Sequence, residues 1–425
     1  MSVAARPRVA LVSYSTKPRG GVVHTLSLAE AMVDLGLPVR VVSLGDQEQG
    51  FHRPVRAPYT LVPAPEARRT LEERVFASVD ALEEGLRAVA DEVDILHTQD
   101  CISARAAARV RDSGADVRVL RTVHHVDDFT TPALVECQRQ AILEPDRLVV
   151  VSEDWRARLQ AEFGRSALVI HNGVDAHRFP AVEPAERTAL RQELALADRF
   201  MFLAVGGIEP RKGSVHLLQA LAILARELEP RPALVVVGGH SFQDYAAYRE
   251  QALGMLPGLG LELGRDVILG GTVSEAALNL YYRSADALAF PSVKEGWGLA
   301  VLEAMTAGLP VVASDIAVLR EYLTDRDTAV LTRVGDPRSL AEGMRAVATD
   351  SALRARLVEG GRSLVTQFSW ERAARAHWQL YLDDVGRERF VGATEGDTRH
   401  GSGWATTAGR GTPCRVPLPT VGRTS

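Results

Sequence analysis

The sequence has few cysteines and no long apolar run, and each absence excludes a class of protein. Only Cys101, Cys137 and Cys414 are present, widely spaced and without a Cys-x-x-Cys pair. A disulfide framework and a cysteine-based zinc site are therefore not expected, and a reducing cytoplasm fits best. No stretch approaches about 18 uninterrupted apolar residues, and the first apolar run is too short for a signal peptide, so no integral membrane segment is expected.

An excess of positive charge is also missing. Lysine and arginine total 49 against 54 aspartates and glutamates, which gives a net charge of −5. This balance provides no basic field for nucleic acid, so no nucleic-acid partner is expected. Contact of a local basic patch with a membrane surface stays open. The 425 residues, of which 46% are hydrophobic, suffice for two ordinary domains and a tail.

Short apolar runs rich in β-branched residues alternate with amphipathic helical stretches. In the first half, strands are expected over Val9–Val12, Val39–Leu44, Asp94–His97, Val117–Val123 and Leu148–Ser152. The pattern then restarts, with strands expected over Phe200–Val205, Ala233–Val237, Asp266–Leu269, Ala287–Phe290, Pro310–Ala313 and Ala329–Thr332. Continuous apolar strands separated by helices indicate parallel sheets covered on both faces. The sequence thus predicts an α/β protein with two doubly wound domains.

The predicted domain boundary lies near residues 175–187, a segment rich in proline and charge. We expect domains over residues 1–180 and 181–368, and a C-terminal helix over residues 369–388 that packs back on the first domain. Helical spacing in this last segment predicts core packing for Trp370, Ala374, His377, Trp378 and Tyr381. The periodicity then stops, and residues 389–425, rich in Gly, Thr, Arg and Ser, are expected to form a disordered tail.

Open parallel sheets bind ligands at the carboxyl ends of their strands, so unusual residues just after predicted strands are candidate site residues. The first such segment, Lys17–His24, contains Gly20 and Gly21 ahead of a helix. Glycines let the backbone approach a ligand, and a helix N-terminus attracts an anion. A tight strand-to-helix turn explains these glycines equally well. Because the segment is not Gly-x-Gly-x-x-Gly, a dinucleotide fingerprint is absent here.

The second segment places His124, His125, Asp127 and Asp128 after a predicted strand. A histidine in that place can hydrogen-bond a substrate or move protons near neutral pH. The spacing matches no known metal-ligand pattern, so no metal site is expected. A solvated loop without a role stays the alternative interpretation.

The third and fourth segments follow strands of the second half. Gly206–Gly213 puts Arg211 and Lys212 beside a glycine turn at a helix start, a combination that suits a pyrophosphate. It lacks the Walker A spacing, which argues against a P-loop ATPase. Further on, Glu295 lies in a glycine-bearing loop and Glu303 near the first turns of the next helix. Both carboxylates can face one crevice and accept hydrogen bonds from sugar hydroxyls, or they can be unrelated surface residues.

Together these segments resemble the retaining glycosyltransferases of family four, which have the GT-B fold, over residues 7–385. Glu295 and Glu303 match the family's EX7E motif within PSVKEGWGLAVLEAMTAGLPVVAS. The stretch Val169–Asp175 resembles the segment ahead of the family's interdomain hinge, and GGIEPRKG resembles its phosphate-binding loop. The pair Gly20-Gly21 is the fourth match. One glutamate pair alone is a weak signal, whereas four motifs in the family's order are specific.

The resemblance implies transfer of a sugar from a nucleotide-diphosphate donor, a UDP- or GDP-sugar, with retention of anomeric configuration. It implies two Rossmann-like domains that face a central cleft, with residues 1–180 on the acceptor side and residues 181–368 binding the nucleotide sugar. It also implies no cofactor and no essential metal, and no Asp-x-Asp lies in a suitable loop. The acceptor, a small molecule, a glycan or a lipid, would contact the loops Asp46–Pro65 and Asp127–Pro132.

The resemblance also implies roles for single residues. Lys212 and Arg211 would hold the donor diphosphate, and His124 matches the family's active-site histidine. Gly20 and Gly21 would face the phosphates, Val273 would contact the nucleobase, and Glu303 would bind the ribose. The loop that faces the donor sugar would consist of Glu295, Gly296, Trp297, Gly298 and Leu299. One departure is Gly207, where the family often has arginine, so Arg211 would have to supply that charge.

Three alternatives stay open at this point. A related phosphorylase or sugar-nucleotide epimerase would share the fold, and a non-catalytic paralogue would bind the donor without turnover. A dinucleotide-dependent oxidoreductase would need the absent Gly-x-Gly-x-x-Gly fingerprint. The intact set of His124, Lys212, Glu295 and Glu303 favours the active transferase.

Overall fold

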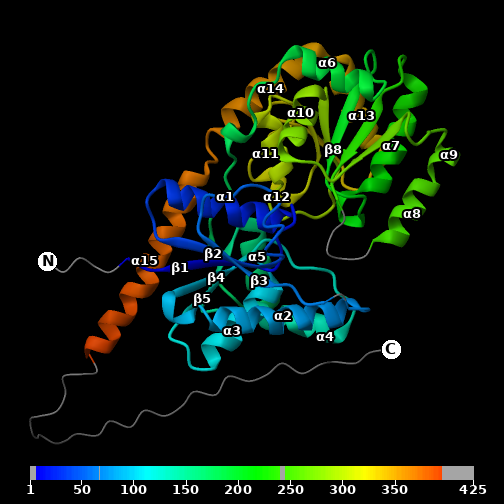
Figure 1. Cartoon of the computed structure of the whole chain (residues 1–425). Coiled ribbons are helices and arrows are strands. Elements are labelled where there is room, and N and C mark those ends of the chain that lie inside the picture. The colour runs from blue at the N-terminus through cyan, green and yellow to red at the C-terminus, as the bar shows by residue number, and fades with distance from the viewer. Residues whose placement is uncertain (1–5, 67, 240–244, 395–425) are drawn as a thin grey trace, which may run out of the picture. The chain divides into compact units, whose positions relative to one another are not determined.

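Two parallel β-sheets form the frame of the protein (Figure 1). The structure, a computed structural model, describes residues 6–66, 68–239 and 245–394. Both sheets lie in one compact unit that ends at Asp383. The first sheet has the strand order β3-β2-β1-β4-β5-β6-β7, and the second has the order β10-β9-β8-β11-β12-β13. The predicted parallel α/β organisation is confirmed.

The strands of the first sheet are β1 (Val9–Ser13), β2 (Val39–Gly45), β3 (Tyr59–Pro63), β4 (Ile95–Thr98), β5 (Arg118–Val123), β6 (Arg147–Val150) and β7 (Leu168–Val169). The strands of the second sheet are β8 (Met201–Val205), β9 (Ala233–Val237), β10 (Val267–Gly271), β11 (Ala287–Phe290), β12 (Val311–Ser314) and β13 (Val330–Thr332). Every strand that the sequence predicts is present, and no bound differs by more than two residues.

The α-helices of the first half are α1 (Gly20–Asp34), α2 (Leu71–Arg87), α3 (Cys101–Asp112), α4 (Pro132–Leu143) and α5 (Glu153–Phe163). Those that follow are α6 (Pro184–Glu193), α7 (Ser214–Glu227), α8 (Ala246–Gly254), α9 (Leu256–Leu259), α10 (Glu275–Ser284), α11 (Leu299–Thr306), α12 (Ala317–Arg320), α13 (Pro337–Thr349), α14 (Ser351–Val365) and α15 (Trp370–Thr394). Short 3-10 helices include η2 (Ala176–Arg178) and η3 (Pro210–Lys212). Within the described ranges, no helix is both long and apolar enough to cross a membrane.

Two edge strands escape the sequence prediction, and each has a physical reason. β3 lies at one edge of the first sheet, ends in a proline and has an exposed Tyr59, so it lacks a continuous apolar signature. It occupies part of the segment Asp46–Pro65 that the sequence predicts as an acceptor loop, and that part is a strand instead. β7, at the other edge, has only two residues.

Helices cover both sheets on their two faces. In the first sheet, α2, α3 and α4 share one buried cluster with the strands, including Leu82 and Leu96, which are fully buried. In the second sheet, α7 and α13 pack on one face around Leu221. On its other face, α10 and α11 contribute Tyr282 and Leu302 to the core. Burial on both faces explains why the strands are apolar throughout.

Each sheet has one point at which the strand order reverses. In the first sheet the reversal falls between β1 and β4, and in the second it falls between β8 and β11. Strands on the two sides of such a point have connections that leave in opposite directions, which opens a crevice at their carboxyl ends. Three of the segments that the sequence analysis selected follow strands at these points: Lys17–His24 follows β1, Gly206–Gly213 follows β8, and the stretch with Glu295 and Glu303 follows β11.

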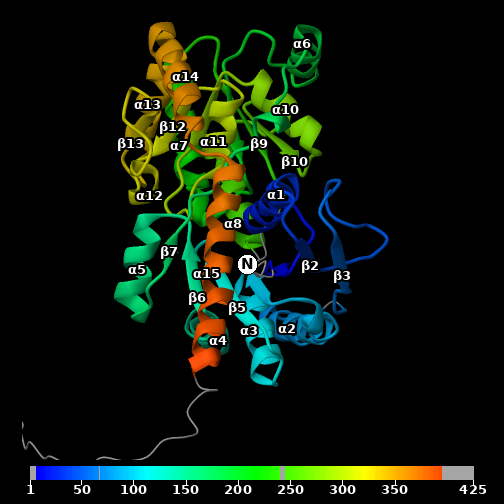
Figure 2. The same ribbon diagram turned by 90° about the vertical axis from the view of Figure 1, so that its left-hand side faces the viewer.

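The helix α15 packs on the first sheet through its first part. Four of the side chains predicted to enter the core are buried, and Trp378 is half-buried; the buried ones are Trp370, Ala374, His377 and Tyr381. The hydroxyl of Tyr381 lies 2.6 Å from Nδ1 of His97 on β4. The ring of Trp370 packs against that of His24 on α1 with centroids 5.3 Å apart, and Figure 2 shows the helix passing α1. The helix continues past residue 389, where the sequence predicts a tail, and residues 395–425 of that predicted tail lie outside the described residues.

The chain crosses itself at Gly173, in the segment that leads from the first sheet to the second. Val174 N–H donates to the carbonyl of Phe368 over 3.1 Å. A Cβ on Gly173 would lie 2.2 Å from the backbone nitrogen of Trp370, so only glycine fits this crossing.

We expect Gly173→Ala to destabilise the protein by about 1–3 kcal/mol, because the added methyl group forces one of the two crossing segments to move. Thermal unfolding of the variant beside wild type measures the loss. The matched control is Gly258→Ala on α9, where a Cβ meets nothing within 4 Å. Equal melting temperatures for wild type and Gly173→Ala would contradict this account of the crossing.

Candidate active site

An ion-pair cluster around a buried carboxylate lies where η3, after β8, meets the loop after β11. Lys212 Nζ lies 2.6 Å from Oε1 of Glu295, and Arg211 Nη1 lies 3.3 Å from the same oxygen. Gly213 makes this approach possible: its φ is +66°, and a Cβ there would lie 2.1 Å from the carbonyl oxygen of Pro291. The sequence-predicted residues Arg211, Lys212 and Glu295 are therefore brought together at the reversal point of the second sheet.

Charge, more than burial, determines the ionisation of Glu295. Burial by itself raises the pKa of this carboxyl group, but the charges of Lys212 and Arg211 outweigh it and lower the pKa to about 2. Burial lowers the pKa of Lys212, and Glu295 opposes that shift. Arg211 also pairs with Glu209 over 3.4 Å. Two cations and two carboxylates thus form a cluster without net charge at neutral pH.

Gly207 occupies the position where the resembled family often has arginine. A Cβ on Gly207 would lie 2.6 Å from the carbonyl oxygen of Gly239, so this backbone has no room for any side chain there. Arg211 instead brings its guanidinium to the same carboxylate as Lys212. The second cation of the cluster is therefore Arg211, in η3, and not a residue at position 207.

The helix α11 begins directly after the loop that carries Glu295. Its N-cap residue Gly298 has φ +90° and provides no side-chain cap, so the first N–H groups of the helix are free of a capping side chain. The same holds for α7, whose N-cap is Gly213, and for α1, whose N-cap is Arg19. Uncapped N–H groups and the helix dipole favour an anion or a hydroxyl oxygen at these ends.

Glu303 lies apart from the cluster around Glu295, one turn into α11. The hydroxyl of Tyr282 on α10 donates to Oε2 of Glu303 over 2.8 Å. Burial raises the pKa of Glu303, and its side chain is largely buried. Glu303 is therefore partnered by a tyrosine, whereas Glu295 is partnered by two cations.

His124 comes from the first sheet and meets the loop of the second. Its Nε2 lies 3.1 Å from Oε1 of Gln99, and burial lowers its pKa to about 3, so the imidazole is neutral at physiological pH. A Cβ on Gly296 would lie 2.1 Å from the carbonyl oxygen of His124, and a Cβ on Gly21 would lie 3.7 Å from its Cδ2. Gly21, His124 and Gly296 are thus brought into contact distance.

The ring of His24 packs against His124 and is itself held by a buried hydrogen bond. Nδ1 of His24 on α1 lies 2.8 Å from Oδ1 of Asn172, and the His24 ring packs edge-on against His124 with centroids 4.6 Å apart. Both partners belong to segments that the sequence analysis named, Lys17–His24 for its glycines and Val169–Asp175 for its resemblance to the segment ahead of the family's hinge.

The other predicted site residues have varied surroundings. Gly20 is exposed at the start of α1, and Val273 is half-buried in the turn between β10 and α10. Leu299 is the first residue of α11. The indole of Trp297 is buried and stacks on His171 with centroids 4.6 Å apart, so it packs in the core. In the second predicted segment, Lys294 Nζ lies 2.7 Å from Oδ1 of Asp128.

Sequence reasoning missed several residues that hold the site together. Gln99 holds His124, Tyr282 holds Glu303, and the indole N–H of Trp155 donates to the carbonyl of Glu295 over 2.9 Å. Tyr282 and Trp155 lie in ordinary amphipathic helices, where an aromatic residue predicts only core packing. No signal in the sequence distinguishes them from other core residues.

Comparison with known proteins agrees with this arrangement. The family model described as Glycosyltransferase Family 4 matches residues 18–178, and the one described as Glycosyl transferases group 1 matches residues 186–364. A D-inositol 3-phosphate glycosyltransferase from Xylanimonas cellulosilytica is 31% identical over 313 residues, which cover 69% of this chain and 73% of that protein.

Solved structures share the fold at low sequence identity. Sucrose-phosphate synthase from Thermosynechococcus elongatus superposes with a TM-score of 0.75 at 23% identity, over 91% of this chain and 100% of that one. HepE from Anabaena, solved with UDP and glucose, superposes with a TM-score of 0.74 at 20% identity, over 88% and 99% of the two chains.

Two parallel Rossmann-like sheets and the matches to glycosyltransferase families and structures define a glycosyltransferase of the GT-B fold. Within that class, the chain belongs to glycosyltransferase family 4. Family membership excludes the dinucleotide-dependent oxidoreductase that the sequence pattern left open.

The ionised state of Glu295 makes a stability prediction that depends on pH. The pKa of Glu295 is about 2 in the folded protein, below the ordinary value of 4.5. The stabilisation that the ionised carboxylate gives the folded state is therefore complete above about pH 4.5 and is lost as the pH falls toward 2. We expect Glu295→Gln to lower the free energy of unfolding by about 1–3 kcal/mol at pH 7. This difference from wild type should narrow by about 1 kcal/mol between about pH 5.5 and pH 3.5.

Denaturant unfolding of both proteins across that pH range measures the effect. The control Glu371→Gln removes an exposed carboxylate paired with Arg375, and its loss should stay within about 0.5 kcal/mol. A Glu295→Gln difference that stays constant or grows as the pH falls would contradict the charged pair.

Proposed function

We propose that this glycosyltransferase moves a sugar from a nucleotide-diphosphate donor to an acceptor with retention of anomeric configuration and without an essential metal. The observation that carries the proposal is the pair of half-buried cations, Arg211 and Lys212, on the buried carboxylate of Glu295. This cluster lies at the reversal point between β8 and β11, and open parallel sheets bind nucleotides at such points.

The donor diphosphate takes the place of a carboxylate as the partner of Lys212. In the ligand-free cluster the lysine is satisfied by Glu295, so a diphosphate has to compete for its N–H groups. Phosphate oxygens carry more charge than a carboxylate and accept hydrogen bonds from Lys212, from Arg211 and from the uncapped end of α7 together. As the glycosidic bond breaks, these donors stabilise the charge that develops on the departing diphosphate.

The released carboxylate of Glu295 then faces the sugar. Backbone N–H groups of Gly296 to Leu299, which include the uncapped end of α11, meet the sugar hydroxyls. Glu303, held by Tyr282, binds the ribose, and the turn at Val273 contacts the base. The acceptor attacks the face of the sugar from which the nucleotide leaves, so no protein nucleophile is required. His124, neutral at physiological pH, hydrogen-bonds the sugar and takes no charge itself.

The donor base and the acceptor are open within this proposal. HepE of Anabaena was solved with UDP and glucose, which makes a UDP-sugar the first donor to test, beside a GDP-sugar. The acceptor is a small molecule, a glycan or a lipid. It would approach from the first sheet, near the loop Asp127–Pro132, whose Asp128 is bound to Lys294.

A thermal-shift screen tests the proposed function directly. Purified protein is heated with UDP, GDP, ADP and their common sugar conjugates, with and without EDTA. A ligand that binds only the folded protein raises the melting temperature by mass action, so one nucleotide family should stabilise it, equally with EDTA. Absence of a shift with every nucleotide, repeated by calorimetry, would sink the proposal and favour a phosphorylase or a site without donor binding.

Lys212→Ala should weaken binding of the nucleoside diphosphate by about 10- to 100-fold, because a charge-assisted contact to phosphate is lost. Binding of the matching nucleoside, which lacks phosphate, should change by less than about twofold. Calorimetric titration of both ligands measures the contrast. Lys294→Ala, at a lysine paired with Asp128, serves as the control with unchanged affinities. Equal losses for both ligands would show that Lys212 does not bind phosphate.

Glu303→Ala should weaken nucleotide-sugar binding by about 1–3 kcal/mol, because a hydrogen-bonded acceptor of the ribose hydroxyls is removed. The corresponding 2′-deoxynucleotide should bind the variant and wild type with a smaller difference. Glu227→Ala at the exposed end of α7 is the control. Unchanged donor affinity in Glu303→Ala would remove the ribose role.

A further inference from the structure

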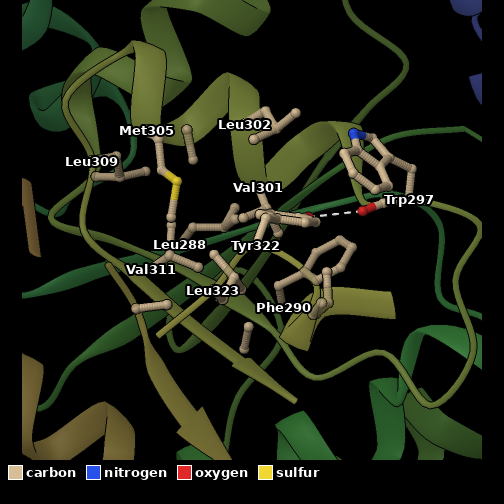
Figure 3. Close-up of a cluster of buried hydrophobic side chains, with 14 of the residues drawn as sticks. Leu288, Phe290, Trp297, Val301, Leu302, Met305, Leu309, Val311, Tyr322 and Leu323 are labelled. Atoms are coloured by element: carbon tan, nitrogen blue, oxygen red, sulfur yellow. Dashed lines mark hydrogen bonds between the residues drawn. The ribbon is translucent and has the colours of Figure 1, made fainter. Parts of the chain in front are cut away.

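Two buried side chains hold the loop that carries Glu295 by its backbone carbonyls. The indole N–H of Trp155 donates to the carbonyl of Glu295 over 2.9 Å. The hydroxyl of Tyr322 donates to the carbonyl of Trp297 over 2.7 Å, as the dashed line in Figure 3 shows. Trp155 is 2% exposed and Tyr322 is 8% exposed, so water does not compete for either bond. Both bonds therefore fix the orientation of a peptide group in an irregular loop.

A fixed carbonyl also fixes the N–H group of the next residue. In a trans peptide the C=O and the following N–H lie in one plane and point in opposite directions. The bond from Trp155 thus sets the direction of the Gly296 N–H, and the bond from Tyr322 sets that of the Gly298 N–H. Within the described part of the chain, neither N–H donates to another protein group. Donors held in place without a partner are ready for a ligand.

Trp155 is itself tied to the half of the protein that carries the loop. Both carboxylate oxygens of Glu321 accept hydrogen bonds from the start of α5, from the N–H groups of Glu153 and Asp154, each over 2.9 Å. Ser152 caps the same helix through the N–H of Trp155. The first turn of α5 is therefore bonded to the end of α12 through Glu321 and to the loop after β11 through Trp155, and the first link holds the indole beside the carbonyl of Glu295.

We propose that Trp155 and Tyr322 are positioning residues that aim the N–H groups of Gly296 and Gly298 at the donor sugar. This inference rests on the proposed function, in which those N–H groups meet the sugar hydroxyls. Neither side chain touches the donor. Their effect is that the loop does not have to reorganise when the sugar arrives, which strengthens binding to groups that these amides reach.

The test separates sugar recognition from nucleotide recognition. Trp155→Phe removes the indole N–H and keeps an aromatic ring, and Tyr322→Phe removes only the hydroxyl. Calorimetry gives the affinities of UDP and UDP-glucose, and of GDP and GDP-mannose. We expect each variant to bind the free nucleotide within about twofold of wild type, because Lys212 and Glu303 are intact. The ratio of nucleotide-sugar affinity to nucleotide affinity should fall about tenfold.

Matched controls separate this effect from lost packing. Leu159→Ala removes a fully buried side chain one turn further along α5, and Tyr281→Phe removes a hydroxyl on α10. Both controls should lower or keep the melting temperature without changing the affinity ratio. If Trp155→Phe folds poorly, Tyr322→Phe still reports on the same loop.

Each result has a distinct meaning. A ratio that falls in Trp155→Phe and Tyr322→Phe but not in the controls supports the positioning role. A ratio equal to that of wild type, with wild type binding the nucleotide sugar, overturns the positioning role and leaves the proposed function intact. Wild type that binds no nucleotide sugar overturns the proposed function, and the positioning role with it.

Discussion

The carboxylate of Glu295 is the constraint around which the site is built. A buried carboxylate without a partner costs several kcal/mol, so the loop after β11 needs cations beside it. Lys212 and Arg211 supply them from the loop after β8, and Gly213 lets the two backbones approach closely enough. The ion pair thereby holds the two strand ends at the reversal point of the second sheet together and keeps both cations in place, where the proposed function needs them for phosphate.

In the proposed function, the same pairing makes donor binding an exchange of partners. Lys212 cannot satisfy Glu295 and a diphosphate to the same extent, so the donor gains a cation and the carboxylate is released toward the sugar. Contacts from the first half limit how far the loop moves during this exchange: the backbone of Gly296 lies against the carbonyl of His124, and the indole of Trp155 holds the carbonyl of Glu295. The proposed function thus redistributes charge while the backbone stays fixed, which is the arrangement that electrostatic catalysis requires.

Much of this could be predicted from the sequence, and what could not has a physical explanation. Buried parallel strands are continuously apolar, so all but the edge strands β3 and β7 were predictable. Motif spacing selected Glu295, Glu303 and Lys212. It did not reveal that the two glutamates have different partners, because Tyr282 lies on another helix. The bond from Trp155 to Glu295 joins residues 140 positions apart, a distance over which a single sequence carries no pairing signal.

The exchange of partners at Lys212 is tested most directly by a crystal structure of the protein with the nucleoside diphosphate that stabilises it. The account predicts that Nζ of Lys212 leaves Oε1 of Glu295, 2.6 Å away in the free protein, and lies within hydrogen-bond distance of the diphosphate. It also predicts that the carbonyl of Glu295 stays on the indole of Trp155. A bound diphosphate held elsewhere, with the pair of Lys212 and Glu295 intact, would contradict it.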